Sequence, residues 1–324
     1  APAAGDADYA VLREHVRRNH EDPFAAVRRA VLSHELVLFG DVHPAAEPKA
    51  LVLRLLEDPG VGARLDAIAF EIPASAQRWV EAYLRSSPED PTLLLREPGM
   101  VRSVWGGSDE WLAIFHRLWE LQRSRERPLV VLAMDLPGWP SVARSARAAA
   151  SLYADRDSAM ASALLGALAR CLDCDRRGGP RVLAFLGGYH VLRGLEADLS
   201  VGPNTSRVIW LATRLERRGV HPYTILTDGL PRRVSIGGEL AYGATRLFDV
   251  LARDGWPAPP YAVAAAPPLD LVRQAVREPD DPRGVTFALR PAGYDLSTVV
   301  DLFVFWGRTT PLSENRTPRP LGRD

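Results

Sequence analysis

Three short, largely apolar runs, each followed at once by a residue that can gain or lose a proton, constrain this chain more than any other feature. They cover residues 36–39, 66–70 and 182–186, and they lead into Gly40-Asp41-Val42-His43, Glu71 and Gly187-Gly188-Tyr189-His190. Apolar runs of this length are typical of strands buried on both faces of a sheet. Open α/β sheets bind ligands beyond the carboxyl ends of their strands, so the three runs predict one shared site.

Helical patterns alternate with these strands. We expect helices over residues 8–33, 49–57, 75–84, 141–174 (with a break near 153–155) and 205–218, another capped by Ser108, and further strands over 129–134 and 223–226. Residues 36–71 would form a βαβ unit, and Gly40 would let the backbone turn tightly as it leaves its strand. The alternation predicts an α/β fold with a mainly parallel central sheet, helices on both faces, and the site at the carboxyl ends of the strands.

Residues 1–324 are predicted to form a single domain. Residues 86–107 are rich in Pro, Gly and Ser and longer than most connections, which predicts a lid or an inserted binding loop. From residue 229 onward the pattern is less regular, with strand-like runs at 234–236, 261–265, 285–289 and 302–306 separated by proline-rich links.

The composition gives no support for a protein that binds nucleic acid or that spans a membrane. The 40 Lys and Arg residues balance the 40 Asp and Glu residues, so the net charge does not favour nucleic acid or an anionic membrane as a partner. No apolar run approaches the ~20 residues needed to cross a bilayer. We expect a small-molecule or peptide substrate, while the oligomeric state stays open. The sequence leaves the location open: cytoplasmic, or secreted or periplasmic if Ala1 is a processed N-terminus.

The chain has two cysteines, Cys171 and Cys174, late in a predicted helix. Redox Cys-x-x-Cys motifs lie at helix starts, and a structural zinc site needs more ligands. The pair is therefore predicted to be ordinary thiols, or a local disulfide in a secreted protein.

His43, Glu71 and His190 are the central candidate site residues. Two imidazoles and a carboxylate can ligate a divalent metal such as zinc, manganese or iron and leave positions open for water and substrate. Without a metal, the same groups can perform acid–base catalysis. Each residue alone has a plainer explanation: a strand-end histidine is often a surface residue, and Glu71 could cap the next helix. Three such residues at corresponding strand ends favour a site.

Four more residues are candidates at the same rim. Asp41 joins the catalytic set as a group that orients a histidine, and Asp135 could do the same or contact substrate; turn-forming aspartates are the alternative for both. Glu47 and Tyr189 are assigned to substrate binding, although a glutamate in the first turn of a helix is common and Tyr189 could belong to the core. The other histidines are expected to be structural or exposed: His15, His20, His34, His116 and His221.

Several familiar signatures are missing from the sequence. It contains no dinucleotide-binding glycine loop, no Gly-x-x-x-x-Gly-Lys phosphate loop, no Gly-x-Ser-x-Gly nucleophile elbow and no His-Glu-x-x-His metal motif. Common nucleotide enzymes and serine hydrolases are therefore poor fits.

The chain resembles the superfamily that joins erythromycin esterases, ChaN-type haem-binding lipoproteins and Tiki/TraB proteases. The resemblance extends over residues 36–311 and rests on short motifs: Gly40-Asp41-Val42-His43, Phe70-Glu71-Ile72-Pro73, Gln77 with 79–84, Arg156-Asp157-Ser158-Ala159-Met160-Ala161, Gly187-Gly188-Tyr189-His190, and 301–305 with 309–311. Asp41 replaces a frequent glutamate, which shortens the reach of the carboxylate.

This resemblance implies a hydrolase of an ester, lactone or amide bond, with water activated by the His43, Glu71 and His190 cluster, either directly or on a divalent metal. The ChaN branch implies a different class, a non-catalytic haem- or metal-binding protein in which Tyr189 or either histidine would be an axial ligand. A tailoring enzyme that performs iron or copper chemistry is a third alternative.

Overall fold

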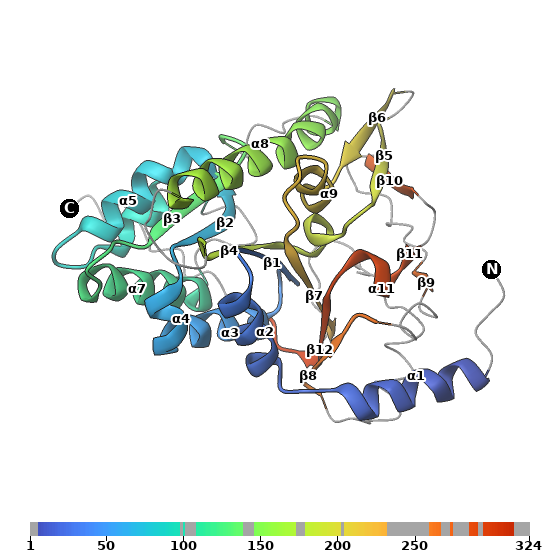
Figure 1. Ribbon diagram of the computed structural model, residues 1–324. Helices are drawn as coiled ribbons and strands as arrows, with labels where there is room; N and C mark the ends of the chain where they lie inside the picture. Colours follow the sequence, from blue (N-terminus) through green and yellow to red (C-terminus); the bar gives the residue numbers. More distant parts are fainter. Residues whose placement is uncertain are drawn as a thin grey trace.

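A seven-stranded sheet forms the centre of the computed structural model (Figure 1). The structure describes residues 6–97, 100, 108–138, 146–172, 179–201, 204–231, 259–266, 273–274, 285–290 and 294–313. The strand order of the seven-stranded sheet is β3-β2-β4-β1-β7-β12-β8. The bounds are β1 Leu36–Asp41, β2 Ala67–Pro73, β3 Val130–Asp135, β4 Val182–Gly187, β7 Tyr223–Pro231, β8 Tyr261–Ala264 and β12 Leu302–Thr309. All neighbours pair in parallel except β8, which runs antiparallel to β12, so the predicted α/β fold is confirmed.

Helices cover both faces of this sheet (Figure 1). On one face, Val37 and Phe39 of β1 pack into a core with α2 Pro23–Ser33, α3 Ala46–Glu57, α4 Pro59–Arg64, α5 Gln77–Arg85 and α7 Asp109–Ser124. On the other, Leu36 and Leu38 pack into a core with α8 Ala146–Leu172 and α9 Leu211–Glu216. Successive residues of a strand point to opposite faces, so an unbroken apolar run is what two covered faces require.

The remaining elements lie around these layers. Small antiparallel sheets consist of β10 Val285–Arg290, β5 Glu196–Val201 and β6 Asn204–Ile209, and of β11 Tyr294–Asp295 and β9 Arg273–Gln274. The other helices among the described residues are α1 Asp6–Asn19, α11 Leu296–Val299 and the 3₁₀ turns η1 Ala74–Ala76, η2 Pro91–Arg96 and η3 Gly188–Val191. None of the described helices is both long and apolar enough to cross a bilayer.

The direction of the connections places a ligand position between β1 and β4. After β1 the chain enters α3 on one face of the sheet, and after β4 it reaches α9 on the opposite face. Adjacent parallel strands whose connections diverge in this way leave a space at their carboxyl ends where α/β proteins bind ligands. The βαβ unit expected over residues 36–71 is interrupted, because β4 lies between β1 and β2.

Other local expectations need correction. Residues 205–209 form β6 and not the start of a helix, because Thr205, Val208 and Ile209 are β-branched and pair with β5. Helix α8 runs without a break through 153–155, which contain no proline or glycine. Gly40 lies inside β1 and not in a turn after it. A glycine is required there because the position is crowded: a Cβ would lie 2.9 Å from a methyl group of Val191.

Other regions were predicted more closely. The strands expected near residues 261, 285 and 302 are present as β8, β10 and β12. Ser108 caps α7 as expected, and its hydroxyl accepts a hydrogen bond from the Trp111 N–H at 3.3 Å. Within 86–107 the structure describes only 86–97 and 100, including η2, so the predicted lid is not tested, and the strand predicted at 234–236 lies outside the described residues.

The exposed edge of β3 is covered by two glutamine side chains. The Gln77 amide donates to the Val131 carbonyl at 3.0 Å and accepts from the Ala133 N–H at 2.8 Å. Gln122 makes the same pair of bonds with the N–H and carbonyl of Leu129. These glutamines therefore occupy backbone groups that would otherwise be open to another strand.

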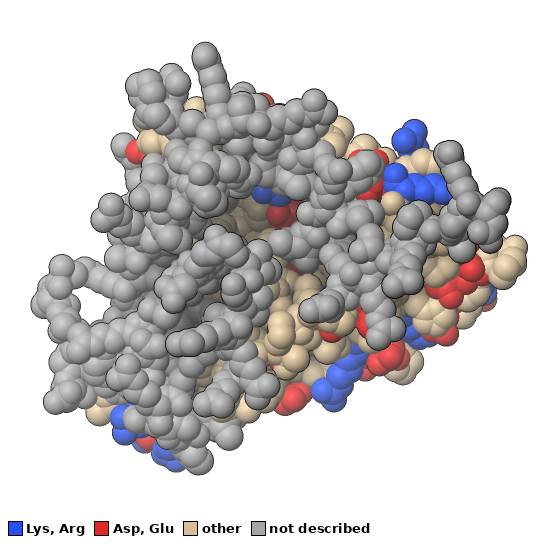
Figure 2. All heavy atoms as spheres, turned by 180° about the vertical axis from the view of Figure 1, so that it is seen from behind, with Lys and Arg blue, Asp and Glu red and all other residues tan. Residues whose placement is uncertain are grey.

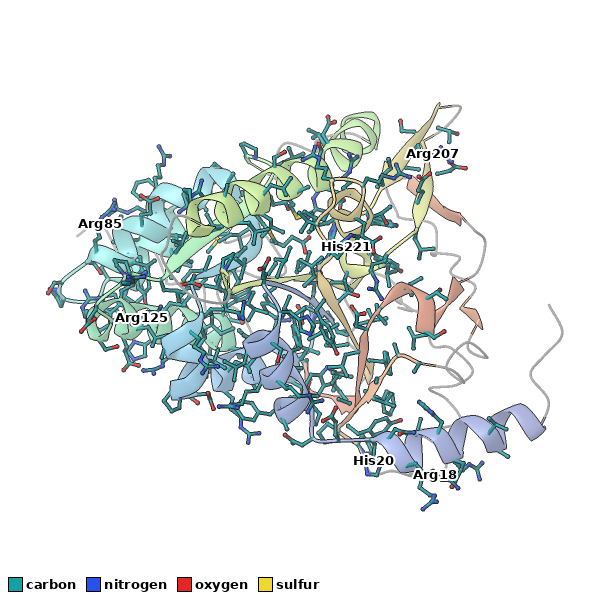
Figure 3. All side chains as sticks on the ribbon, in the orientation of Figure 1. Arg18, His20, Arg85, Arg125, Arg207 and His221 are labelled. Carbon is teal, nitrogen blue, oxygen red and sulfur yellow. The ribbon has the colours of Figure 1, made fainter. Side chains whose placement is uncertain are left out.

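Charged side chains lie mainly around the periphery. On the described part of the back face, Figure 2 shows basic and acidic atoms interspersed. Arg18, Arg85 and Arg207 extend from the outer parts of α1, α5 and β6 (Figure 3). A charged group that is buried in this protein is therefore expected to have a specific partner close by.

Candidate active site

Glu71 stands at the centre of a buried cluster at the carboxyl end of the sheet. Strand β2 places its carboxylate beside the end of β4, where the Gly187 N–H donates a 2.6 Å hydrogen bond to Oε2. A Cβ at position 187 would lie 2.8 Å from His43 Nε2 and 3.3 Å from Glu71 Oε2. Glycine therefore lets the backbone approach the carboxylate closely.

His43 follows β1 and is oriented by Asp41. Its Nδ1 lies 3.2 Å from Asp41 Oδ2, and its Nε2 lies 3.9 Å from Glu71 Oε2. A carboxylate can only accept a hydrogen bond, so in the neutral form of the imidazole this contact favours the tautomer with its proton on Nδ1 and Nε2 as the acceptor. The His43 side chain is 18% exposed, against 8% for His190, which makes it the more accessible imidazole of the cluster.

His190 lies between two carboxylates. Its Nδ1 is 2.7 Å from Asp157 Oδ1, and its Nε2 is 3.4 Å from Glu71 Oε1. Burial acts to lower the pKa of His190, but the two carboxylates outweigh it and raise the pKa to about 10. The Leu211 N–H also donates to Asp157 at 2.6 Å. His190 is therefore a protonated hydrogen-bond donor at neutral pH and not a base.

Arg156, from the middle of α8, holds Glu71 and Asp135 together. Its guanidinium donates to both oxygens of Asp135 at 2.9 and 2.6 Å and to Glu71 Oε1 at 2.5 Å. Burial acts to raise the pKa of Glu71, but His190 and Arg156 lower it well below its ordinary value. Glu71 is thereby kept as a carboxylate at neutral pH.

Lys49, on the first turns of α3, completes the cluster. Its ammonium donates to Asp41 Oδ2 at 2.6 Å and to the His43 carbonyl at 2.7 Å. The side chain is fully buried. Hydrogen bonds therefore join Lys49 to Asp41 and Arg156 to Glu71, and His43 lies between the two pairs, 3.2 Å from Asp41 Oδ2 and 3.9 Å from Glu71 Oε2.

The structure brings His43, Glu71, His190 and Asp41 into one cluster. Asp135 joins this cluster through Arg156, which also contacts Glu71. The other two predicted residues face different partners: Glu47 accepts a 2.7 Å hydrogen bond from the Thr310 N–H, and the Tyr189 ring stacks on Trp210 with centroids 5.7 Å apart.

Sequence reasoning did not select Arg156, Asp157 or Lys49 as site residues. The first two are part of the Arg-Asp-x-x-Met-Ala motif, which was a usable signal. Lys49 is the only lysine in the chain, and that exception was a signal as well.

The remaining histidines lie outside the cluster. His34 stacks on Tyr223, the His116 Nδ1 is 2.8 Å from Glu89, and His15 contacts Asn19 on its own helix. His20 directly follows α1 at the lower edge of the molecule, and the exposed His221 precedes β7 (Figure 3).

The donor set does not suit a metal ion. In the described part of the chain, no group of three or more His, Cys, Asp or Glu side chains is arranged to hold one. Arg156 is a permanent cation 2.5 Å from Glu71 Oε1, where it would repel a divalent ion. Haem ligation would compete with existing contacts, since both nitrogens of His190 face carboxylates and Tyr189 stacks on Trp210.

Comparison of the fold finds several similar solved structures. A Bacillus cereus protein matches with a TM-score of 0.57 at 10% identity, covering 96% of this chain and 99% of that one. A succinoglycan biosynthesis protein matches with a TM-score of 0.59 at 10% identity, covering 95% and 99%. An erythromycin esterase variant in its open conformation matches with a TM-score of 0.57 at 12% identity, covering 90% and 95%. At these identities the likeness shows the fold alone.

Sequence comparison adds nothing to this result. No protein-family model matches the chain, and no curated protein matches it significantly.

Proposed function

We propose that this chain is a hydrolase that cleaves an ester, lactone or amide bond of a small molecule or peptide with water activated by His43. The observation that carries the proposal is the 3.9 Å separation of His43 Nε2 and Glu71 Oε2. This distance is too long for a direct hydrogen bond, but one water molecule can donate to both atoms. The erythromycin esterase among the similar folds is a hydrolase, which also favours this class.

In the proposed reaction, the water oxygen attacks the carbonyl carbon while one water proton passes to His43 Nε2. Asp41 stabilises the resulting imidazolium through Nδ1, as the aspartate of a hydrolase triad does. The tetrahedral intermediate then expels the alcohol or amine, which receives the proton from Nε2. Glu71, held anionic by Arg156 and His190, orients the water and takes no proton itself.

The test is hydrolysis of p-nitrophenyl acetate, a macrocyclic lactone such as erythromycin, and a peptide anilide by the purified protein. His43→Gln and Glu71→Gln should each lower kcat by about 10²-fold or more on any substrate that the wild type hydrolyses. His221→Gln, which removes an exposed imidazole elsewhere, is the matched control and should leave kcat unchanged. Wild-type kcat in His43→Gln would refute the proposal.

The same preparation distinguishes the cofactor alternatives. Metal content and the absorption spectrum are measured on protein purified without added metal or chelator, beside His43→Ala/His190→Ala. Stoichiometric zinc, manganese or iron that is lost in the double variant would replace the metal-free mechanism with a metal-dependent one. A Soret band lost in the double variant would indicate a haem-binding protein.

A further inference from the structure

Lys49 differs in type from every other basic residue of the chain. Of 40 basic residues, it alone is lysine and all the others are arginine. It is also fully buried, in a chain whose basic groups lie largely on the surface. A buried lysine is costly because its charge loses hydration, and it lies in the first turns of α3, where a cation opposes the helix dipole. Lys49 therefore does not stabilise its own helix, and its position needs another reason.

The contacts of Lys49 supply that reason. Its ammonium donates to Asp41 Oδ2 at 2.6 Å, to the His43 carbonyl at 2.7 Å and to the Val42 carbonyl at 3.3 Å. These three acceptors belong to consecutive residues that carry the chain from the end of β1 to His43. An ammonium directs its three donors from a single nitrogen, so it fits acceptors that cluster around one point, whereas a guanidinium is larger and spreads its donors within one plane.

Asp41 connects Lys49 to the reacting imidazole. The same atom, Oδ2, accepts from Lys49 and faces His43 Nδ1 at 3.2 Å. The other oxygen, Oδ1, is buried without a hydrogen-bond partner among the described residues. The orientation of this carboxylate is therefore set by Lys49 on one side and His43 on the other.

We propose that Lys49 is a positioning residue that fixes Asp41 and the backbone of His43, so that the imidazole carries its proton on Nδ1 and presents Nε2 to water. Its catalytic meaning rests on the proposed hydrolase function, while its effect on the His43 tautomer does not. Burial lowers the pKa of Lys49, and Asp41 makes the largest contribution among the neighbouring carboxylates that oppose this effect.

The first experiment measures the tautomer without any substrate. Protein labelled with ¹⁵N-histidine is examined by NMR, and His43→Gln identifies the His43 signals among the seven histidines. We expect the wild type to show a protonated Nδ1 and an unprotonated Nε2. Lys49→Met, which keeps the length of the side chain and removes the charge, should show a mixture of tautomers. Arg54→Met removes an exposed cation from the same helix and should leave the wild-type pattern.

The second experiment separates positioning from binding. With a substrate that the wild type hydrolyses, Lys49→Met should lower kcat about tenfold or more, because small displacements of a catalytic group are costly, and KM should stay within about threefold. Lys49→Arg should lose kcat as well, since the guanidinium does not match the three acceptors. Arg54→Met should retain both constants.

The results of the two experiments separate the positioning role of Lys49 from the proposed hydrolase function. If Lys49→Met does not fold, Asp41→Asn/Lys49→Met removes both buried charges and should fold, because a neutral pair avoids the uncompensated ion. That variant should also lack a single His43 tautomer. A wild-type tautomer pattern in a folded Lys49 variant would overturn the inference even if the protein is a hydrolase. A wild type that hydrolyses none of the substrates would count against the proposed function alone, because the NMR result still decides the role of Lys49.

Discussion

His43 Nε2 and Glu71 Oε2 lie 3.9 Å apart across the backbone of Gly187, at the ends of three neighbouring strands. Neither group is mobile in its surroundings, since Asp41 faces the far nitrogen of His43 while Arg156 and the Gly187 N–H hold the Glu71 carboxylate. An imidazole nitrogen and a carboxylate oxygen held at this separation can both accept a hydrogen bond from one water molecule.

Gly187→Ala should lower activity strongly with a limited effect on stability. The added methyl would lie 2.8 Å from His43 Nε2, so the imidazole must move away from Glu71. We expect kcat to fall by about 10²-fold and the free energy of unfolding by about 1–3 kcal/mol, measured by substrate turnover and urea denaturation. Gly188→Ala is the matched control, because its Cβ would meet the flexible Leu226 side chain at 3.1 Å. Equal activity losses in both variants would contradict the explanation.

Arg156→Met should destabilise the protein more than the small change in side-chain shape would suggest. It leaves Glu71 and Asp135 buried without their shared cation. Removing one partner of a buried ion pair costs about 3–5 kcal/mol, to be measured by urea denaturation at neutral pH. The control is Arg207→Met, whose arginine is 60% exposed and pairs with Glu196. That exposed pair should contribute no more than about 1 kcal/mol, so a similar loss in both variants would be evidence against a special role for Arg156.

The sequence was sufficient for the parts of the site that lie directly after strands. Apolar runs identify buried strands, and Asp41, His43 and Glu71 follow such runs at once, so their convergence is a consequence of parallel pairing. His190 lies within the short 3₁₀ turn η3 that directly follows β4, which keeps it at the same edge.

The groups that set the protonation of this cluster were harder to predict. Arg156 contacts Glu71 from 85 residues away, and Asp157 contacts His190 across 33 residues. Both lie within a long helix whose side-chain directions depend on how α8 packs on the sheet. Lys49 lies in the first turn of α3, eight residues after Asp41, but the pattern of its helix does not reveal that its side chain points back toward Asp41.

Gln77→Ala and Gln122→Ala together should promote self-association. They expose the backbone groups of Leu129, Val131 and Ala133 along the edge of β3. Unpaired groups on an edge strand can pair with a second chain. We expect the double variant to form larger species at a lower protein concentration than the wild type, measured by light scattering after size-exclusion chromatography. Gln77→Glu keeps one acceptor and should show a smaller effect, and an unchanged size distribution in the double variant would show that the edge is protected in another way.

The pair formed by His190 with Asp157 and Glu71 should make stability depend on pH in the alkaline range. The pKa of His190 is raised from 6.5 to about 10, so the folded protein binds this proton more tightly than the unfolded chain does. Its contribution to stability is therefore full below about pH 6.5 and is lost as the pH rises toward 10. The free energy of unfolding of the wild type should exceed that of His190→Gln most at pH 6, and the difference should shrink steadily up to pH 10. His221→Gln, which removes an exposed imidazole, controls for the general effect of the substitution. A difference between wild type and His190→Gln that stays constant from pH 6 to 10 would mean that His190 is not held in its protonated form by these carboxylates.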